Sequence, residues 1–230
     1  MSPRAPLRRR TPPRNEAELL ARAHALAGHS LFEIACALQV PGDPEGGLHG
    51  KGQAGELIEA ALGAPLTSGQ EHDFPALEIE LKTVPLQPNG TPRESTYVCH
   101  FALDQAGTLD WATSWARKKL ARVLFVTTSD ARTPWPERVV HEAILWSPDA
   151  EEEALLRADF EELVGLAARG RVDELVAARG HVMQVRPKAA NGRVRTQLIT
   201  EDGDAIATVP RGFYLRARFV ASVLQRCKPA

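Results

Sequence analysis

The sequence has few cysteines and no long hydrophobic run. Its three cysteines, Cys36, Cys99 and Cys227, form no C-x-x-C pair, which argues against a disulfide framework and a zinc finger and fits a reducing cytoplasm. No apolar run approaches the roughly 18 residues of a membrane span, and the arginine-rich N-terminus lacks the apolar stretch of a signal peptide. We therefore expect a cytoplasmic protein without a membrane segment.

Histidine motifs of zinc enzymes are also missing, because the seven histidines form neither an H-x-x-x-H nor an H-E-x-x-H pattern. The composition is instead typical of a globular protein: 230 residues, of which 43% are hydrophobic and 25% are charged. A chain of this length folds as one large domain or as two lobes. It buries roughly 70% or more of its extended surface without help from a metal or a disulfide.

The formal net charge of −1 is unevenly distributed along the chain. Residues 181–230 hold nine Lys and Arg against three Asp and Glu, a balance of +6, so the first 180 residues carry −7. A basic C-terminal segment beside an acidic body is typical of a polyanion-binding protein whose active centre needs carboxylates. A chance asymmetry is the alternative, so charge alone does not decide the partner.

The chain begins with a stretch rich in arginine and proline. Residues 1–14 contain five arginines, four prolines and no acidic residue, which predicts a flexible tail. The remaining residues, 15–230, form the predicted folded domain. Within it, Asn15 and Ser30 are each followed three residues later by glutamate, a capping-box spacing that predicts two early helices.

A glycine-rich loop over residues 41–52 precedes a predicted helix over 53–62, an arrangement that lets the loop approach a phosphate. Strict polar and apolar alternation predicts a strand over 77–82, and a second strand is predicted over 97–103. We expect these strands to pair as a hairpin with a long loop that contains the turn at 87–90.

The rest of the chain mixes predicted helices with short strands. The predicted helices cover 115–122, 149–166 and 219–224, and the predicted strands cover 123–126, 143–146, 182–185 and 213–215. Acidic residues crowd the start of the 149–166 helix, near the positive end of the helix dipole. We interpret them as a solvated face that stabilises this helix.

The segment from Asp73 to Lys82 contains an Asp-x6-Glu-x-Lys pattern. Hydrolysis of a phosphodiester needs a cation to offset the charge of the pentavalent transition state and an activated water. Asp73 and Glu80 can hold Mg²⁺ through oxygen ligands, while Lys82, on the same strand face as Glu80, can orient the water. The alternative is a solvated strand face, of which E-x-K alternation is equally typical.

Two further charged residues fit this chemistry. Glu59, on the predicted helix after the glycine-rich loop, is an additional acid that can point at the strand. Lys119, in the basic helix, can reach a phosphate. For Lys119 the alternative is a solvated basic helix face.

Several stretches in the same order, covering the chain from about residue 15 to the last helix, resemble one known family. They are QEHDFPALEIELKT, STYVCHF, ARKKLARVLF, ILWSP, VRPKAANGR and VPRGFYL. The chain is similar to the MutH family of strand-discriminating mismatch-repair endonucleases. The resemblance implies an α/β fold of the type II restriction endonuclease-like class, a mixed sheet flanked by helices, with a catalytic N-terminal lobe and a recognition C-terminal lobe that form a DNA-binding cleft.

The resemblance also implies roles for the charged residues described above. Asp73, Glu80 and Lys82 match the metal-binding acids and the lysine of the family's catalytic motif. Glu59 matches the helix acid that supports this lysine, and Lys119 matches a phosphate-contacting lysine. The implied reaction is a Mg²⁺-dependent nick on the unmethylated strand of hemimethylated GATC, 5′ to the G, by a monomer that MutL activates.

Sequence recognition lies elsewhere in the family. Arg186, Pro187 and Lys188 match a loop that enters the major groove, where arginine and lysine bind base acceptors. Tyr214 matches the residue near the adenine whose methylation is sensed, and Lys51 matches a lysine of the glycine-rich loop that contacts bases and backbone. A core tyrosine and a surface lysine are the respective alternatives.

Two features depart from the family pattern. The tail over residues 1–14 looks unlike the family and is expected to be unordered or to contact DNA nonspecifically. Glu78 adds a third acid to the active strand, where it either tunes the metal site or turns outward. Two alternative functions remain: a dimeric restriction-type endonuclease that cuts both strands of GATC, and a catalytically silent DNA-binding module. An incomplete Asp-x6-Glu-x-Lys set would favour the silent module, and here the set is complete.

Overall fold

The structure is a computed structural model that describes residues 10–39, 53–66, 71–188 and 193–227. The chain divides into two compact units. The first unit consists of Met1–Arg93, Arg122–Trp146 and Leu224–Ala230, and the second of Glu94–Ala121 and Ser147–Val223. Each unit draws on separate stretches of the sequence, so no single boundary divides an N-terminal lobe from a C-terminal lobe.

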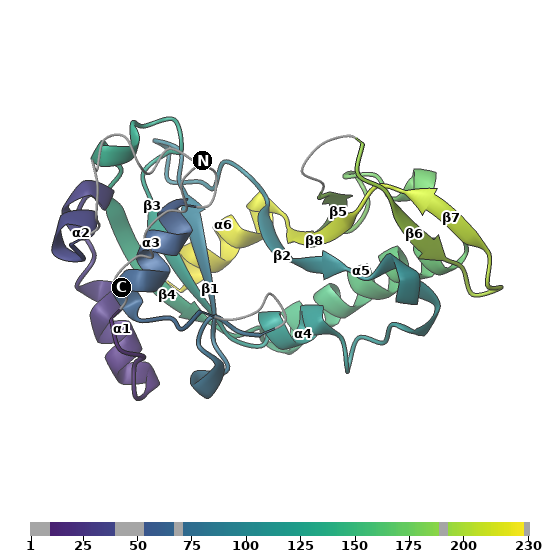
Figure 1. Ribbon diagram of the computed structural model, residues 1–230, viewed down its shortest axis with the longest axis horizontal. Coiled ribbons are helices and arrows are strands. Elements are labelled where there is room, and N and C mark those ends of the chain that lie inside the picture. Colours follow the sequence, from purple (N-terminus) through teal and green to yellow (C-terminus); the bar gives the residue numbers. More distant parts are fainter. Residues whose placement is uncertain (1–9, 40–52, 67–70, 189–192, 228–230) are drawn as a thin grey trace. The chain divides into compact units, whose positions relative to one another are not determined.

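The first unit is built on a mixed three-stranded sheet in the order β1-β3-β4 (Figure 1). β1 runs parallel to β3, and β4 runs antiparallel to β3. The strands are β1 (Glu80–Pro85), β3 (Val123–Thr128) and β4 (Val140–Trp146). The helices are α1 (Glu16–His24), α2 (Leu31–Ala37) and α3 (Gln53–Leu62), with single turns of 3-10 helix at Pro75–Leu77 and Trp135–Glu137.

This unit forms because each of its elements has an apolar face to bury. The central strand β3 is buried along its whole length, as a strand covered on both sides of the sheet requires. One face of the sheet packs against the helices through Leu57 of α3, Leu81 of β1 and Leu124 of β3. The predicted caps are confirmed: the Asn15 side chain accepts a hydrogen bond at the start of α1, and Ser30 forms a complete capping box in α2.

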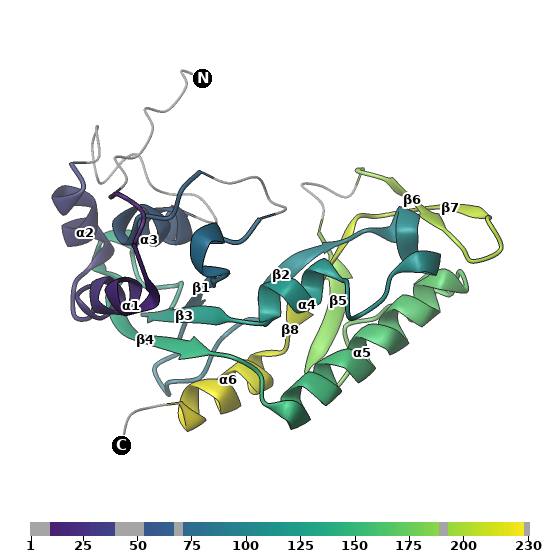
Figure 2. The same cartoon turned by 90° about the horizontal axis from the view of Figure 1, so that it is seen from below.

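The second unit contains a separate antiparallel sheet in the order β2-β8-β5 and a two-stranded sheet of β6 and β7 (Figure 2). The strands are β2 (Thr96–Phe101), β5 (Met183–Pro187), β6 (Thr196–Ile199), β7 (Ala205–Thr208) and β8 (Arg211–Leu215). The helices are α4 (Trp115–Leu120), α5 (Ala150–Ala168) and α6 (Ala217–Arg226), with 3-10 turns at Leu103–Thr108 and Val172–Glu174. The division between the units falls inside α6, after Val223.

Aromatic rings form the core of the second unit. Phe213 of β8 lies between Phe101 of β2 and Phe160 of α5, with ring centroids at 4.6 and 5.2 Å. Trp111 extends the stack, with its ring centroid 5.3 Å from that of Phe160. Because side chains alternate along a strand, the residues on either side of Phe213 point to the opposite face of the sheet, away from this core.

The predicted hairpin between the two early strands is wrong. β1 pairs with β3, whereas β2 pairs with β8 in the other sheet. The turn at 87–90 does form, since the Gln87 N–H donates to the Thr91 carbonyl at 2.8 Å. The antiparallel pairing continues only through a bridge between Leu86 and Pro92 and a bond of 3.4 Å from the Arg93 N–H to the Pro85 carbonyl, and both prolines lack the N–H group that a longer ladder needs.

The strand predicted over 77–82 begins later, at Glu80. Leu77 ends the 3-10 turn that Pro75 starts, and Glu78 caps this turn with φ 54°, in the left-handed region. Glu78 is exposed and lies outside the strand. Of the two orientations expected for Glu78, the structure therefore favours the outward one.

The hairpin of β6 and β7 is absent from the sequence-based prediction. Its turn contains Gly203, whose φ of +88° suits glycine, and the Gly203 N–H donates to the Thr200 carbonyl. An Asp-Gly pair between short alternating segments is the sequence signal for such a hairpin. Over the described ranges, no helix has both the length and the apolar character needed to cross a membrane.

The described part of the expected tail, residues 10–14, packs onto the first unit. The Arg10 N–H donates to the Ala60 carbonyl at 3.1 Å, and Pro13 is buried. Arg14 bonds to the Glu18 carboxylate with both its backbone N–H and its side chain. These five residues therefore belong to the folded unit, while residues 1–9 lie outside the described part.

Candidate active site and recognition surface

Asp73, Glu80 and Lys82 come together at the start of β1. The Asp73 Oδ2 atom accepts a hydrogen bond of 2.8 Å from the Leu81 N–H, which belongs to the peptide group that follows Glu80. The Lys82 Nζ lies 2.5 Å from the Glu80 Oε1, across one face of the strand. Asp73 is thus bonded to the backbone of β1, while Glu80 and Lys82 on this strand pair with each other.

The six residues between Asp73 and Glu80 bring these acids together by forming a closed loop. Phe74 is buried, and it bridges to Ile79 through hydrogen bonds in both directions, of 3.0 and 3.3 Å. Between them lie the 3-10 turn that begins at Pro75 and the left-handed Glu78. The loop returns the chain to its starting point, so that Asp73 lies beside the first residues of β1.

The charges at this site are largely removed from water. Glu80 is 1% exposed, and the side chain of Lys82 is 15% exposed. Taking charged groups out of water is costly unless they are paired, as Glu80 and Lys82 are.

Asp73 and Glu80 are carboxylate donors that could hold a divalent metal ion. Among the described residues, no group of three or more His, Cys, Asp and Glu could hold a metal ion. Structural and catalytic zinc sites use three or four protein ligands, whereas Mg²⁺ is bound by one or two carboxylates together with waters and substrate phosphate. Asp73 and Glu80 match the second pattern.

Glu59 lies on α3, close to Thr83 of β1. A Cβ atom placed on Gly55 would lie 4.0 Å from the Glu59 Oε1 and 3.9 Å from the Thr83 Oγ1, so both oxygens line the space beside Gly55. The ion pair found for Lys82 is with Glu80. The support of Lys82 by Glu59 stays a prediction.

Lys119 belongs to α4 in the second unit and is 7% exposed. Its Nζ lies 5.5 Å from the centre of the Trp115 ring, a cation-π arrangement. The alternative of a solvated helix face therefore does not hold for Lys119, although it does hold for the exposed Lys118. The phosphate contact of Lys119 stays a prediction.

The predicted recognition residues lie on one face of the β2-β8-β5 sheet. Arg186 pairs with Gly212 across β5 and β8, while Gln184 pairs with Tyr214, so these side chains share a face. The Arg186 guanidinium lies 5.9 Å from the centre of the Tyr214 ring. Pro187 ends β5, and all three residues Arg186 to Lys188 are exposed. This face is polar and basic, opposite the aromatic core.

Tyr214 keeps its phenol proton at neutral pH. Burial raises the pKa of Tyr214, and the charge of Arg186 acts in the opposite direction with a smaller effect. A protonated phenol can both donate and accept a hydrogen bond. The Tyr214 hydroxyl can therefore form hydrogen bonds with the edge of a base.

Tyr97 is a member of this face that the sequence alone does not single out. Its ring lies 5.3 Å from that of Tyr214, edge to face, and the Lys188 Nζ lies 4.4 Å from its centre. A Cβ on Gly212 would come within 2.7 Å of the Tyr97 ring, so only glycine fits there. The signal in the sequence is the cross-strand pairing of Tyr97 with Tyr214, which becomes visible only once the register of β2 and β8 is known.

Asp159 on α5 holds the start of the recognition strand. Its buried carboxylate accepts hydrogen bonds from the backbone N–H groups of His181, Val182 and Met183, at 2.6 to 2.9 Å. Asp159 lies beyond the acidic start of α5, so the interpretation of those first acids as a solvated face does not extend to it. The reason is tertiary: β5 begins directly against this turn of the helix.

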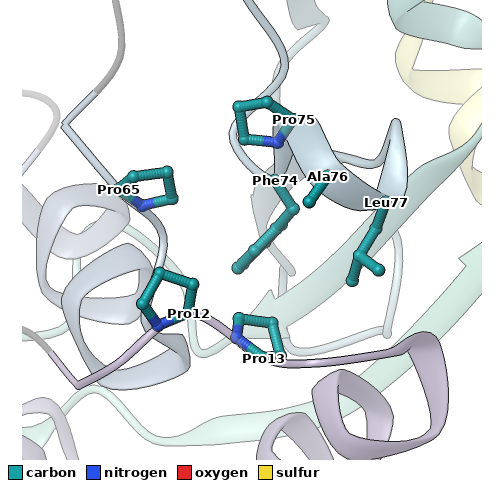
Figure 3. A pocket seen from close by; sticks show the side chains of 7 residues that line it. All are labelled: Pro12, Pro13, Pro65, Phe74, Pro75, Ala76 and Leu77. Carbon is teal, nitrogen blue, oxygen red and sulfur yellow. The ribbon is translucent and has the colours of Figure 1, made fainter.

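An open apolar pocket of about 210 Å³ lies next to Asp73 (Figure 3). Phe74 and the 3-10 turn form one wall, and two prolines from the N-terminal segment form the other. Its lining residues are Pro12, Pro13, Pro65, Phe74, Pro75, Ala76 and Leu77. None of them can bind a metal or move a proton, so this pocket is not the reaction centre. Lys51 lies outside the described residues.

Comparisons with known proteins agree with the motif and the sheet that carries it. A family model described as "DNA mismatch repair enzyme MutH" matches residues 62–159. The chain is 45% identical over 218 residues to a protein from Serratia proteamaculans named "DNA mismatch repair protein MutH", covering 94% of both chains. Proteins of the same name from Shewanella baltica (strain OS155) and Klebsiella pneumoniae (strain 342) are 46% and 44% identical, with 94% of this chain and 96% and 94% of theirs covered.

Proposed function

The chain belongs to the MutH family of DNA mismatch repair enzymes, and on that premise we propose that it nicks the unmethylated strand of hemimethylated GATC, 5′ to the G, by Mg²⁺-dependent hydrolysis. The observation that carries this proposal is the closed loop that brings the Asp73 carboxylate to the peptide next to Glu80. A chain that only bound DNA would have no need for two acids and a buried lysine at one point.

In the proposed mechanism, Asp73 and Glu80 would hold the metal ion. When bound, Mg²⁺ supplies positive charge against the phosphate and lowers the pKa of a water. Lys82 orients the attacking water and offsets negative charge, which its position on the same strand face as Glu80 supports. We assign Glu59 to the support of Lys82, and Lys119 to a phosphate contact.

Recognition is assigned to the polar face of the second unit. Arg186, Pro187 and Lys188 would enter the major groove, where Arg186 can bind base acceptors. Tyr214 would lie next to the adenine N6, since methylation there removes one donor hydrogen and adds bulk. Lys51 is assigned to base and backbone contacts, on the family resemblance alone.

The proposal includes the biological setting. The substrate is double-stranded DNA, the activator is MutL, and the protein acts as a monomer in the cytoplasm. A monomer with one Asp-x6-Glu-x-Lys set cuts one strand at a time, which distinguishes a nicking enzyme from a dimeric restriction enzyme.

The test uses end-labelled duplexes that carry one GATC site in the unmethylated, hemimethylated or fully methylated form. We expect Mg²⁺-dependent nicks on unmethylated strands, none on fully methylated DNA, and faster nicking when MutL is added. Simultaneous cutting of both strands would support the restriction-type alternative. Binding without any cutting, in a protein that shows a cooperative thermal transition, would support the silent module.

A further inference from the structure

Thr83, the residue after Lys82, carries a buried hydroxyl group without a satisfied hydrogen bond. Among the described residues, its Oγ1 has no hydrogen-bond partner, although the atom is shielded from solvent. Native proteins satisfy the large majority of buried polar groups, and exceptions often belong to functional sites. A valine of the same shape would avoid this cost, so the hydroxyl calls for a functional explanation.

The surroundings of this hydroxyl indicate its partner. Thr83 and Leu81 lie on the face of β1 that packs against α3, because side chains alternate along the strand and Leu81 belongs to the core with α3. The Thr83 Oγ1 and the Glu59 Oε1 lie 3.9 and 4.0 Å from the same point, the Cβ position of Gly55. Gly55 precedes Glu59 by four residues, one helical turn, and both oxygens lie next to its Cβ position.

We propose that Thr83 is a positioning residue of the nuclease, whose hydroxyl donates to the Glu59 carboxylate, directly or through one water, when DNA and metal engage the site. This bond would tie α3 to the strand that carries Glu80 and Lys82. The inference rests on the proposed nicking activity. Hydrogen bonds of an active site are often long before the substrate binds and shorten in the working complex.

The first test is Thr83→Val, which removes the hydroxyl and keeps the shape of the side chain. No hydrogen bond within the described residues is lost, so we expect an unchanged or higher Tm. The kcat for nicking the hemimethylated duplex should fall by about threefold to tenfold, the effect of one hydrogen bond, at unchanged KM. Thr83→Ser keeps the hydroxyl and should restore most of the kcat.

The second test is Gly55→Ala, which adds a methyl group next to both oxygens. The added methyl would meet them at ordinary contact distances of 3.9 and 4.0 Å, and alanine favours a helix more than glycine does. We therefore expect a higher Tm together with a lower kcat. Gly165→Ala in α5 is the control, because it also raises helix propensity, its methyl would meet the end of the flexible Arg169 side chain at 3.2 Å, and it lies far from β1 in sequence, so that kcat should stay unchanged.

The outcomes separate this inference from the proposed function. If the wild-type protein nicks none of the duplexes, the proposed function fails and the role of Thr83 fails with it. If the wild type nicks while Thr83→Val and Gly55→Ala both keep the wild-type kcat, only the inference about Thr83 is overturned. A fall in kcat for both stable variants, with rescue by Thr83→Ser, supports it.

Discussion

Replacing Asp159 by alanine is expected to destabilise the second unit by about 3–6 kcal/mol. The carboxylate accepts the N–H groups of His181, Val182 and Met183, and the latter two residues are buried. Hydrogen bonds to a charged group contribute about 1.5–3 kcal/mol each, and a buried donor that loses its partner is not resolvated. Two such donors give the stated range, with the more exposed His181 adding little.

The assay combines urea unfolding with amide hydrogen exchange. Urea gives the change in the free energy of unfolding, and exchange at Val182 and Met183 reports on the start of β5 directly. Both amides should lose protection in Asp159→Ala. Asp159→Asn keeps one acceptor oxygen and should lie between the wild type and Asp159→Ala.

The matched control is Glu161→Ala on the same helix. Glu161 forms an exposed ion pair with Arg157, with side chains 51% and 62% exposed, and such a pair contributes little. Its loss should change the stability by less than about 0.5 kcal/mol. An Asp159→Ala protein as stable as this control, with protected Val182 and Met183 amides, would refute the assigned role of the carboxylate.

Four further predictions concern catalysis, recognition and pH. Asp73→Ala should abolish nicking but keep DNA binding, measured by cleavage and band shift, and retained Mg²⁺-dependent cutting would contradict the metal assignment. Arg186→Ala should weaken cutting of GATC relative to a scrambled duplex by about 1–3 kcal/mol, and equal losses on both would oppose base recognition. Tyr214→Ser should narrow the rate difference between hemimethylated and fully methylated DNA at an unchanged Tm, and unchanged ratios would leave Tyr214 a structural residue. Hydrogen bonds from the Arg14 backbone, then from arginine side chains, lower the pKa of Glu18 from 4.5 to about 2. The ionised Glu18 therefore contributes its full stabilisation above pH 4.5, and this contribution is lost as the pH falls towards 2. In Glu18→Gln, the Tm should depend less on pH between 4.5 and 2 than it does in the wild type.

The chemistry of the site can be predicted from the sequence better than its geometry. The Asp-x6-Glu-x-Lys spacing identifies Asp73, Glu80 and Lys82, and the structure brings them together. The expected route was a longer strand, however, and the observed one is a loop closed by the Phe74 and Ile79 bridge. Alternation cannot distinguish a strand from a short turn followed by a strand, because both fit the same few residues.

The residues that the sequence does not reveal all depend on long-range pairing. Tyr97 lies on the polar face of the β2-β8-β5 sheet because it pairs with Tyr214, more than a hundred residues later in the chain. Asp159 acts on backbone groups at the start of β5, and an acid on a helix looks the same in sequence whether it is solvated or buried. Local propensity carries no information about such partners, so they emerge only from the packed fold.

The two faces of strand β8 serve different purposes: one contributes to the stability of the second unit, and the other carries its proposed function. Phe213 points into the aromatic core and Tyr214 to the polar face, because adjacent side chains of a strand alternate. Gly212 lies on the polar face and leaves room for the Tyr97 ring. A substitution at Phe213 would therefore act mainly on folding, whereas one at Tyr214 removes contacts with Tyr97 and Arg186 on the recognition face and leaves the core intact. Changes in methylation discrimination at Tyr214 can thus be attributed to recognition whenever the Tm is preserved.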